Sequence, residues 1–203
     1  GKTIQELGRD SMLVYQKNPN FNNNRDPRLR ASVFVPYESF QGQYTLDPFY
    51  NPSDKIGETK STATGYWIKK YVDARDRQSK SGSLDFMIIR YAEILLNYSE
   101  ALIESGEWNH ADVTRYINEV RSRAAMPAIN TGLYNSQAKM RELIRRERQA
   151  ELAFEGGRYF DIRRWGIDTE VLNGEVYGAT NPTTGELVKV QTRKYNRSRE
   201  GLW

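Results

Sequence analysis

The strongest constraint on the fold is a helical repeat of apolar residues that begins near Asp85. Between residues 85 and 105 the apolar or small positions recur every three or four residues, at Ile88, Ala92, Leu95, Ser99 and Leu102. This spacing is typical of an amphipathic helix that buries one face. Gly106 follows Ser105 and supplies the left-handed residue that commonly ends a helix, so the helix is predicted to stop at this pair.

Two further helices are predicted downstream. Asn109 suits an N-cap, and the apolar stripe of the helix after it consists of Val113, Tyr116, Ile117, Val120 and Ala124. The third helix is predicted to open at Ser136 and to end at Phe154 or Glu155, before a pair of glycines. Because the first two helices are joined by a short turn, they are expected to pack antiparallel, as in a tetratricopeptide-like hairpin.

The flanking regions lack such a repeat. The first 84 residues are rich in Asn, Pro and Gly, which predicts irregular loops with short strands at residues 32–35 and 65–72. The tail after Gly166 has a similar composition, and a hairpin is predicted at residues 174–191. The predicted fold class is therefore mainly α: a helical core of one tetratricopeptide-like helix hairpin plus a third helix, with long irregular loops and little β structure.

A chain of 203 residues can bury one good core, so a single domain is expected. Within it the sequence predicts a loop-rich part (1–84), a helical core (85–166) and a loop-rich tail (167–203).

The composition argues against several classes of function. There is no Cys and one His, His110, so thiolate zinc sites, disulfides and histidine-based triads are not expected. The 30 basic and 26 acidic residues are interspersed and the net charge is +4, which does not resemble the basic stripe of a nucleic-acid binder. Phosphate loops, dinucleotide-binding glycine motifs, nucleophile elbows and calcium loops are missing too, so neither a metal nor a cofactor is expected.

Three glutamates on the third predicted helix form the first candidate site. Glu147, Glu151 and Glu155 are spaced i, i+4, i+8, which places them on one face with neighbouring Cβ atoms about 5–6 Å apart. A carboxylate pair at that distance is compatible with a retaining glycosidase. Carboxylates on one helix are poorly placed to flank a sugar ring, however, and possible ion-pair partners lie nearby: Arg148, Arg158, Arg163 and Arg164. A structural salt-bridge cluster is therefore favoured over catalysis.

An aromatic loop forms the second candidate. One stretch punctuated by Pro and Gly contains Tyr37, Phe40, Tyr44, Phe49 and Tyr50. Aromatic rings on loops offer flat apolar platforms with a polar edge, which suits the C–H face of a sugar. The alternative is that the rings pin the loop to the core. The predicted ligand-binding residues are Tyr37, Tyr44, Phe49 and Tyr50.

Several segments resemble the SusD/RagB family. In the family's order they are DPRLR (26–30), GYWIKKYVD (65–73), RYAEILLNYSEALIESGEWN (90–109), INEVRSRAAMP (117–127), LIRRERQAELAFEGGRYFDIRRWG (143–166) and YNRSREGLW (195–203). The likeness is close over most of residues 85–166 and thinner elsewhere. Ala125 stands where many members have Gly, a difference that affects a turn.

The resemblance implies a mostly α-helical lipoprotein on the surface of the bacterial outer membrane. Such a protein binds oligosaccharides or other nutrients without turnover, in a polysaccharide-utilisation system, and its partner is a SusC-like TonB-dependent transporter on which it sits as a lid. Members carry a tetratricopeptide-containing N-terminal half and a lipidated Cys. This sequence shows neither, so we expect it to be the C-terminal portion of a longer protein whose lipid anchor lies elsewhere.

In the family picture the charged residues of the signature are structural. Here they are Glu147, Glu151, Glu155, Arg158, Asp161, Arg163 and Arg164. Ligand contacts vary between members and come largely from loops, so no binding residue carries over by motif. Two alternatives stay open: a glycoside hydrolase that uses the helix carboxylates, and a purely structural docking module.

Overall fold

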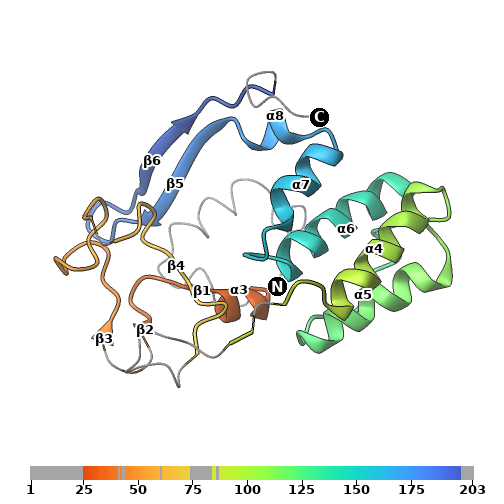
Figure 1. Ribbon diagram of the computed structural model, residues 1–203, viewed down its shortest axis with the longest axis horizontal. Coiled ribbons are helices and arrows are strands. Elements are labelled where there is room, and N and C mark those ends of the chain that lie inside the picture. The colour runs from red at the N-terminus through yellow and green to blue at the C-terminus, as the bar shows by residue number, and fades with distance from the viewer. Residues whose placement is uncertain are drawn as a thin grey trace. The chain divides into compact units, whose positions relative to one another are not determined.

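The computed structural model of the chain describes residues 25–40, 42, 44–59, 61–73, 84, 85 and 87–197. The chain divides into two compact units (Figure 1). The first, called the helical unit, contains residues 26–29 and 83–158. The second, called the hairpin unit, draws on residues 30–82 and 159–203.

Three helices make up most of the helical unit: α4 (Tyr91–Glu104), α5 (Ala111–Arg123) and α6 (Gln137–Glu151). Both α5 and α6 pack against α4 (Figure 1). The centre of their shared core is formed by Leu96, Ile103, Val113, Ile117, Met140 and Ile144. The prediction of a mainly helical chain with a helix hairpin and a third helix is confirmed.

The ends of these helices follow local sequence signals. The first helix ends at Glu104 with Ser105 as its C-cap, and Gly106 adopts a φ of 96°, so the helix stops at the predicted pair. The second helix is capped by His110 rather than by Asn109, since the His110 Nδ1 atom accepts a hydrogen bond of 3.2 Å from the Asp112 amide. Ser136 caps the third helix as predicted, accepting from the backbone N–H of Lys139.

The buried face of α4 agrees with the predicted stripe in part. Leu95 and Ser99 of the stripe are buried, and Ala92 and Leu102 pack partly buried against the core. The helix begins at Tyr91, so Ile88 precedes it and is 84% exposed. Leu96 and Ile103, which the stripe did not include, are fully buried as well, because α4 is apolar on more than one face and its buried surface is wider than the stripe.

The turn after α5 contains a residue with left-handed backbone. Ala125 has a φ of 55°, and its amide donates to the Ser122 carbonyl at 3.0 Å. The next amide, that of Met126, donates to the Arg121 carbonyl at 3.0 Å. This pattern closes the end of a helix and normally uses Gly at the left-handed position, so Ala125 occupies a place where glycine is sterically preferred.

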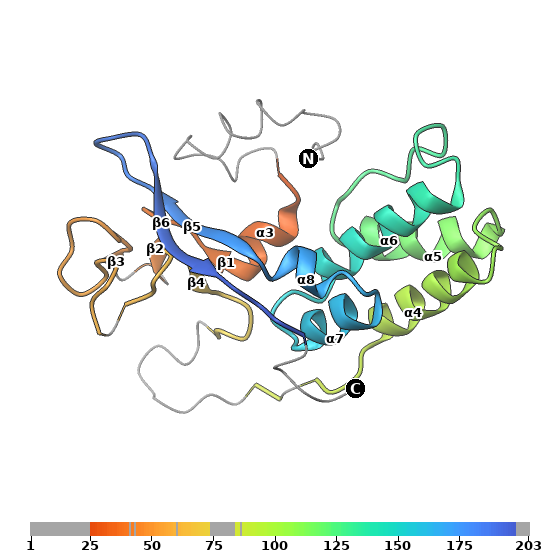
Figure 2. The same ribbon diagram turned by 90° about the horizontal axis from the view of Figure 1, so that it is seen from above.

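The hairpin unit holds most of the β structure (Figure 2). Antiparallel pairs form between β1 (Val33–Phe34) and β4 (Trp67–Ile68), and between β2 (Ser39–Phe40) and β3 (Tyr44–Thr45). The longest pair joins β5 (Gly174–Thr180) to β6 (Leu187–Arg193), which confirms the predicted hairpin. Of the strands predicted at residues 32–35 and 65–72, two residues each are formed, as β1 and β4, which pair with each other.

Short helices complete the described chain. They are α3 (Pro27–Ser32), whose first residues belong to the helical unit, α7 (Gly157–Arg164) and α8 (Asp168–Val171). The charged and aromatic residues 158–164 are helical and lie in α7. Among the described residues, no helix has the length and apolar character needed to cross a bilayer.

A close backbone contact fixes β5 against the loop before β4. The Ala179 amide donates to the Thr64 carbonyl at 2.7 Å. A Cβ atom on Gly178 would lie 2.4 Å from that same carbonyl oxygen, which is shorter than any tolerable contact. Position 178 therefore requires glycine, and the contact sets the position of the β5–β6 hairpin within its unit.

Candidate functional site

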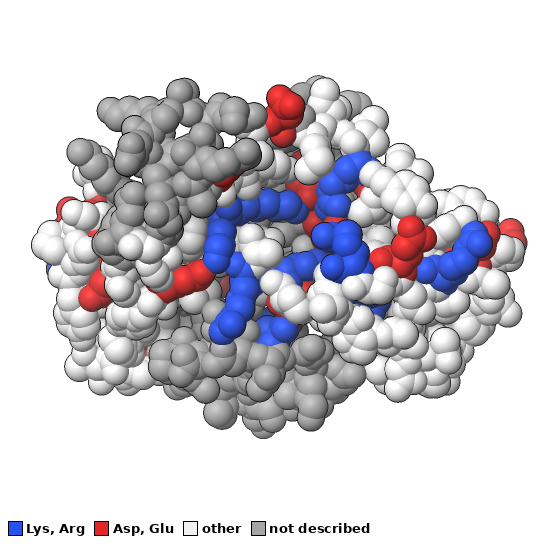
Figure 3. Space-filling view, turned by 90° about the horizontal axis from the view of Figure 1, so that it is seen from below, with Lys and Arg blue, Asp and Glu red and all other residues white. Residues whose placement is uncertain are grey.

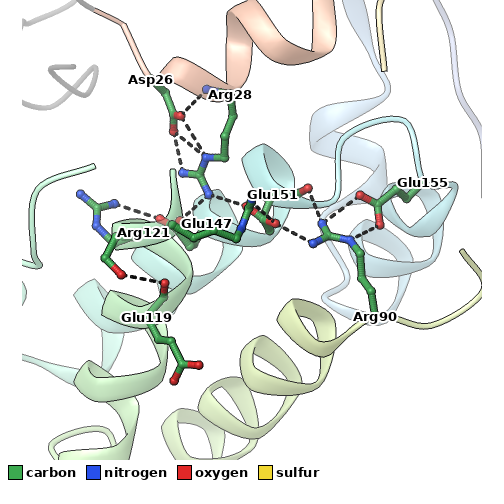
Figure 4. A network of polar contacts seen from close by, with 10 residues as sticks. Asp26, Arg28, Arg90, Glu119, Arg121, Glu147, Glu151 and Glu155 are labelled. Atoms are coloured by element: carbon green, nitrogen blue, oxygen red, sulfur yellow. Dashed lines mark hydrogen bonds and ion pairs between the residues drawn. The ribbon is translucent and has the colours of Figure 1, made fainter. Parts of the chain in front are cut away.

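A buried carboxylate pair organises the helical unit (Figure 4). Glu147 and Glu151 project from successive turns of α6, and their side chains are 3% and 1% exposed. The Arg28 guanidinium donates through Nη1 to both, at 2.6 Å to Glu147 Oε1 and 3.1 Å to Glu151 Oε2. Asp26 binds the other side of the same guanidinium, with 2.6 Å between Arg28 Nη2 and Asp26 Oδ2. One arginine thus links three carboxylates.

A second arginine extends this arrangement towards the end of α6. Arg90, which directly precedes α4, donates from Nη1 to Glu151 Oε1 at 2.6 Å and from Nε to Glu155 Oε2 at 2.8 Å. It also donates to the Glu151 carbonyl oxygen at 2.6 Å. Since that carbonyl lies at the C-terminal end of α6, where helix carbonyls lack intrahelical donors, Arg90 acts as a C-terminal cap.

The last turn of α5 supplies two more arginines. Arg121 Nη1 lies 2.9 Å from Glu147 Oε2, and Arg123 Nη2 lies 2.7 Å from Glu151 Oε1. We call the whole set the arginine–carboxylate network; its members are Asp26, Arg28, Arg90, Arg121, Arg123, Glu147, Glu151 and Glu155. It joins four segments of the chain, and every member lies in the helical unit.

The network keeps its carboxylates ionised. Burial alone would raise the pKa of the Glu151 carboxyl group, but hydrogen bonds from Arg90 and Arg28 outweigh burial and lower it below its ordinary value. The pKa of Asp26 is lowered in the same way, with burial opposed by Arg28. For the Arg28 guanidinium, burial works against the charged form, and the bonds to Asp26 and Glu147 raise its pKa.

This geometry suits structure better than catalysis. A glycosidase acid needs a raised pKa and a nucleophile needs access to the sugar, whereas Glu151 has a lowered pKa and a side chain that is 1% exposed. In the part of the chain that the structure describes, no cluster of His, Cys, Asp or Glu is arranged to hold a metal ion. The glutamates instead accept hydrogen bonds from arginines that sequence spacing did not identify.

The remaining signature residues lie on α7. Asp161 is buried and pairs with Arg164 at 2.8 Å. Arg163 donates to the hydroxyl groups of Tyr159 at 2.8 Å and Tyr195 at 3.1 Å. Arg158 is half-buried on the same helix. The glutamates of the signature belong to the helical unit, and Asp161, Arg163 and Arg164 belong to the hairpin unit.

A further buried acid, which the sequence did not suggest, lies beside this helix. Asp168 is fully buried and accepts hydrogen bonds from Tyr195 at 2.9 Å and from Arg197 Nε at 2.8 Å. The bond from Arg197 lowers the pKa of Asp168. Burial and the bond to Asp168 raise the pKa of Tyr195 to about 12. These contacts hold the segment after β6 against α8, which is a structural role.

The aromatic loop presents two exposed tyrosines. Tyr37 and Tyr50 are 40% and 64% exposed, while Phe49 is half-buried. The side chain of Tyr44 lies outside the described residues. Partial burial, together with the nearby Asp47 carboxylate and Tyr50 hydroxyl, raises the pKa of Tyr37. Tyr37 therefore lies within electrostatic range of both Asp47 and Tyr50.

Side-chain-to-backbone hydrogen bonds hold this loop in shape. Asp47 Oδ1 accepts from the amides of Phe49 at 3.0 Å and Tyr50 at 3.1 Å. The Asp47 amide in turn donates to Asp54 Oδ2 at 3.2 Å, and Asp54 is buried. Such turns fix the backbone on which the aromatic side chains stand. The Tyr50 hydroxyl also lies 2.6 Å from Thr183 Oγ1 in the turn between β5 and β6.

The helical unit contains a hollow of about 660 Å³ beside the start of α4 and the end of α5. Its apolar lining includes Met87, Tyr91, Leu95 and Val120. The guanidinium groups of Arg90 and Arg123 at its edge are bonded to Glu151. The lining of the hollow is therefore mainly apolar, with Glu119 and Ser122 as further polar residues.

Charges of both signs lie close together on the surface. Figure 3 shows a face on which Lys and Arg side chains gather with Asp and Glu side chains beside them. This mixture agrees with the interspersed charges of the sequence and differs from the one-signed surface typical of nucleic-acid binding.

The model of the SusD family matches residues 8–201 of the chain. The chain belongs to the SusD family. SusD-family members are non-catalytic binding proteins, and the bonded state of the α6 glutamates agrees with that description.

Named relatives support the assignment. The chain is 33% identical over 153 residues to SusD-like protein P2 of Formosa agariphila, a match that covers 72% of this chain and 30% of that protein. A SusD-like carbohydrate binding protein from Bacteroides fragilis superposes with a TM-score of 0.72 and 30% identity, over 91% of this chain and 40% of that one. A second SusD-like protein of B. fragilis gives a TM-score of 0.72 at 27% identity, covering 87% of this chain and 35% of that one. The chain therefore spans well under half the length of each of these SusD-like proteins.

Proposed function

We propose that this SusD-family chain takes part in the non-catalytic binding of glycans or oligosaccharides at the cell surface. The observation that carries the proposal is the aromatic loop, which exposes the side chains of Tyr37 and Tyr50 to 40% and 64% and in which Asp47 shapes the turn that carries Tyr50. A similar protein from B. fragilis is described as carbohydrate binding. Rings of this kind suit the apolar face of a sugar, and the neighbouring carboxylate suits its hydroxyl groups.

The backbone of the loop supports the same interpretation. Tyr37 has a φ of 66°, in the left-handed region that a bulky residue rarely adopts. Strained backbone of this kind persists only where surrounding contacts enforce it, and it is common at binding sites. Here the Tyr37 amide donates to the Leu46 carbonyl at 2.7 Å, and Leu46 is 1% exposed. The strain is therefore maintained by an anchored segment that keeps the Tyr37 ring near the surface.

We further propose that bound glycan passes to a SusC-like TonB-dependent transporter in the outer membrane. This part of the proposal rests on membership of the SusD family and on the resemblance of the chain's motifs to it. Attachment to the membrane would use a lipid anchor outside the present sequence, as in other members of the family.

Affinity electrophoresis tests the binding proposal directly. The chain is run through gels that contain amylopectin, laminarin, xyloglucan, arabinoxylan or polygalacturonate, and positive results are quantified by isothermal titration. Retardation by at least one polysaccharide is expected, and Tyr50→Ala or Tyr37→Ala should weaken it at least about tenfold, because an aromatic platform dominates sugar affinity. Tyr98→Ala is the matched control, since Tyr98 is 45% exposed but lies on α4.

Two outcomes would reject the proposal in favour of the alternatives. Release of reducing ends that Glu151→Gln abolishes would establish a hydrolase. Binding that is absent for every polysaccharide, or present but unchanged by Tyr37→Ala and Tyr50→Ala, would instead leave a structural docking module or a site elsewhere.

A further inference from the structure

Tyr50 combines an exposed ring with an anchored hydroxyl group. The ring is 64% exposed, yet its hydroxyl lies 2.6 Å from Thr183 Oγ1, a residue 133 positions away in the sequence. An exposed tyrosine normally samples several rotamers, and ordering it on a ligand costs entropy. A tyrosine held at its tip has lost that freedom already, while its faces remain open to solvent.

The turn that carries Thr183 is itself rigid. Asn181 Oδ1 accepts from the amides of Thr183 at 2.8 Å and Thr184 at 3.2 Å. Backbone bonds of 2.8 Å join the Asn181 amide to the Glu186 carbonyl and the Gly185 amide to the Asn181 carbonyl. Hydrogen bonds between the Asn181 side chain and nearby amides therefore stabilise this turn. Asp47 makes the same kind of bonds in the loop of Tyr50.

The position of this turn relative to the aromatic loop is also set. Both belong to the hairpin unit. The strand leading into the turn is held by the bond between the Ala179 amide and the Thr64 carbonyl, and Gly178 leaves no space between the two backbones. A Cβ atom on Gly65 would lie 3.0 Å from the Cβ atom of Ala179, so this contact is tight over consecutive residues. Thr183 thus meets Tyr50 from a fixed support.

We infer that the β5–β6 turn and the aromatic loop form one subsite for an uncharged sugar ring, in which Thr183 is the positioning residue for Tyr50. This inference rests on the proposed function and adds the β5–β6 turn to its binding site. Thr183 acts through Tyr50, because it orients the ring on which a pyranose stacks. Since the ring is already ordered, less conformational entropy is lost when the sugar binds, and the affinity is higher.

The charged residues of the aromatic loop and of the β5–β6 turn favour an uncharged ligand. Asp47 lies close to the backbone of Tyr50, since its carboxylate accepts a hydrogen bond from the Tyr50 amide at 3.1 Å. Other charged residues of residues 45–59 and of the β5–β6 turn are mostly acidic: Asp54, Glu58 and Glu186, against Lys55. A uronic acid or sulfated sugar on this platform would therefore meet charge of its own sign, which weakens binding.

Single-atom changes on both sides of the bond test the inference. Thr183→Val removes the hydroxyl and keeps the shape, and is expected to weaken binding of the best neutral polysaccharide about fivefold. Thr183→Ser retains a hydroxyl and should restore most of the affinity. Tyr50→Phe should cost about as much as Thr183→Val, and the double variant Tyr50→Phe with Thr183→Val should cost little more than either one alone. Thermal unfolding of each variant checks that the fold is intact.

The outcomes separate this inference from the proposed function. If Tyr50→Ala abolishes binding while Thr183→Val and Thr183→Ser behave like the unmodified chain, glycan binding stands and the positioning role of Thr183 is wrong. Additive losses in the double variant would also reject it, because the two groups would then act independently. Binding of polygalacturonate in preference to every neutral polysaccharide would overturn the assignment to uncharged sugars. Failure of all polysaccharides to bind would overturn the proposed function, and this inference with it.

Discussion

The two units of the chain use polar side chains in opposite ways. In the helical unit, eight charged residues of the arginine–carboxylate network bind one another, and Glu147, Glu151 and Arg28 are nearly inaccessible to solvent. In the hairpin unit, Asp47 and Asn181 bind nearby backbone amides and shape exposed loops, on which Tyr50 and Thr183 remain accessible. The first arrangement joins distant segments, and the second presents side chains to a ligand.

This difference explains why the most conspicuous charges are a poor guide to function here. Three glutamates in a row suggest a catalytic site, yet each accepts hydrogen bonds from arginines. The tyrosines of the aromatic loop carry no charge and follow no regular spacing, but they are the exposed groups held in a defined place. Recognition is therefore expected in the hairpin unit, and stability in the helical unit.

The largest predicted effect is that of Glu151→Gln. The change leaves Arg28, Arg90 and Arg123 short of a buried partner, which should reduce the free energy of unfolding by about 3 kcal/mol. Urea unfolding followed by circular dichroism measures the loss, and hydrogen exchange should show it in α4, α5 and α6. Glu142→Gln is the control, since Glu142 is exposed on the same helix and should matter by less than about 0.5 kcal/mol. Equal effects of the two changes would contradict a structural role for the network.

The second-largest predicted loss of stability comes from the close backbone contact at Gly178 in the hairpin unit. Gly178→Ala places a methyl group 2.4 Å from the Thr64 carbonyl oxygen, and the strand must move to relieve the clash. A loss of about 2 kcal/mol is expected, with faster hydrogen exchange in β5 and β6. Gly157→Ala, where a Cβ atom meets nothing within 4 Å, should be neutral or slightly stabilising. If Gly178→Ala is equally harmless, the hairpin is not fixed by this contact.

Acid should destabilise the helical unit, although less than Glu151→Gln because protonation is partial. The lowered pKa of Asp168 predicts an effect of the same sign on the hairpin unit. Glu151 and Asp26 have lowered pKa values in the folded chain. The unfolded chain therefore takes up protons first as the pH falls. The stabilisation is complete above the ordinary carboxyl pKa values of about 4 and is lost progressively below them. Urea midpoints measured from neutral pH downwards should fall in that window, with a flatter profile for Glu151→Gln. Identical profiles would show that Glu151 does not titrate in this way.

One change in the helical unit should increase stability. Ala125 has a φ of 55°, which costs a residue with a Cβ atom about 1 kcal/mol. Ala125→Gly is therefore expected to raise the free energy of unfolding by about 0.5–1 kcal/mol. The neighbouring Ala124 has a φ of −92°, so Ala124→Gly should not stabilise and serves as the control. A destabilised Ala125→Gly variant would mean that the flexibility gained by the unfolded chain outweighs the relief of strain.

Local signals in the sequence predicted much of the fold. Helix periodicity, the glycine after Ser105 and the cap at Ser136 concern neighbouring residues, and the structure has these features. The buried face of α4 was predicted in part: Leu95 and Ser99 were expected on it, whereas Leu96 and Ile103 were not, because a helix that is apolar on several sides does not specify the width of its contact. Strand pairing between β1 and β4 likewise depends on contacts across more than thirty residues.

The sites were harder to predict because their partners are remote. Arg28 is 119 residues from Glu147, and Thr183 is 133 residues from Tyr50. Spacing along one helix revealed the glutamates but pointed to arginines near them in the sequence. The better signal was the set of motifs that resemble the family, since DPRLR, RYAE and INEVRSR supply Arg28, Arg90, Arg121 and Arg123. Motifs that look unrelated along the chain meet in one network.

The smallest predicted change in stability is that of Tyr50→Ala. This variant best separates the binding role of the hairpin unit from the stabilising role of the arginine–carboxylate network. The ring is 64% exposed and its bond to Thr183 is open to water, so the free energy of unfolding should change by less than about 0.5 kcal/mol. Glu151→Gln should show the reverse, with a large loss of stability and little effect on binding by the fraction that remains folded. Urea unfolding and titration with polysaccharide on the same two variants separate these roles. A loss above about 2 kcal/mol in Tyr50→Ala would mean that the ring pins its loop to the core, and the aromatic loop would then be a structural element rather than a binding surface.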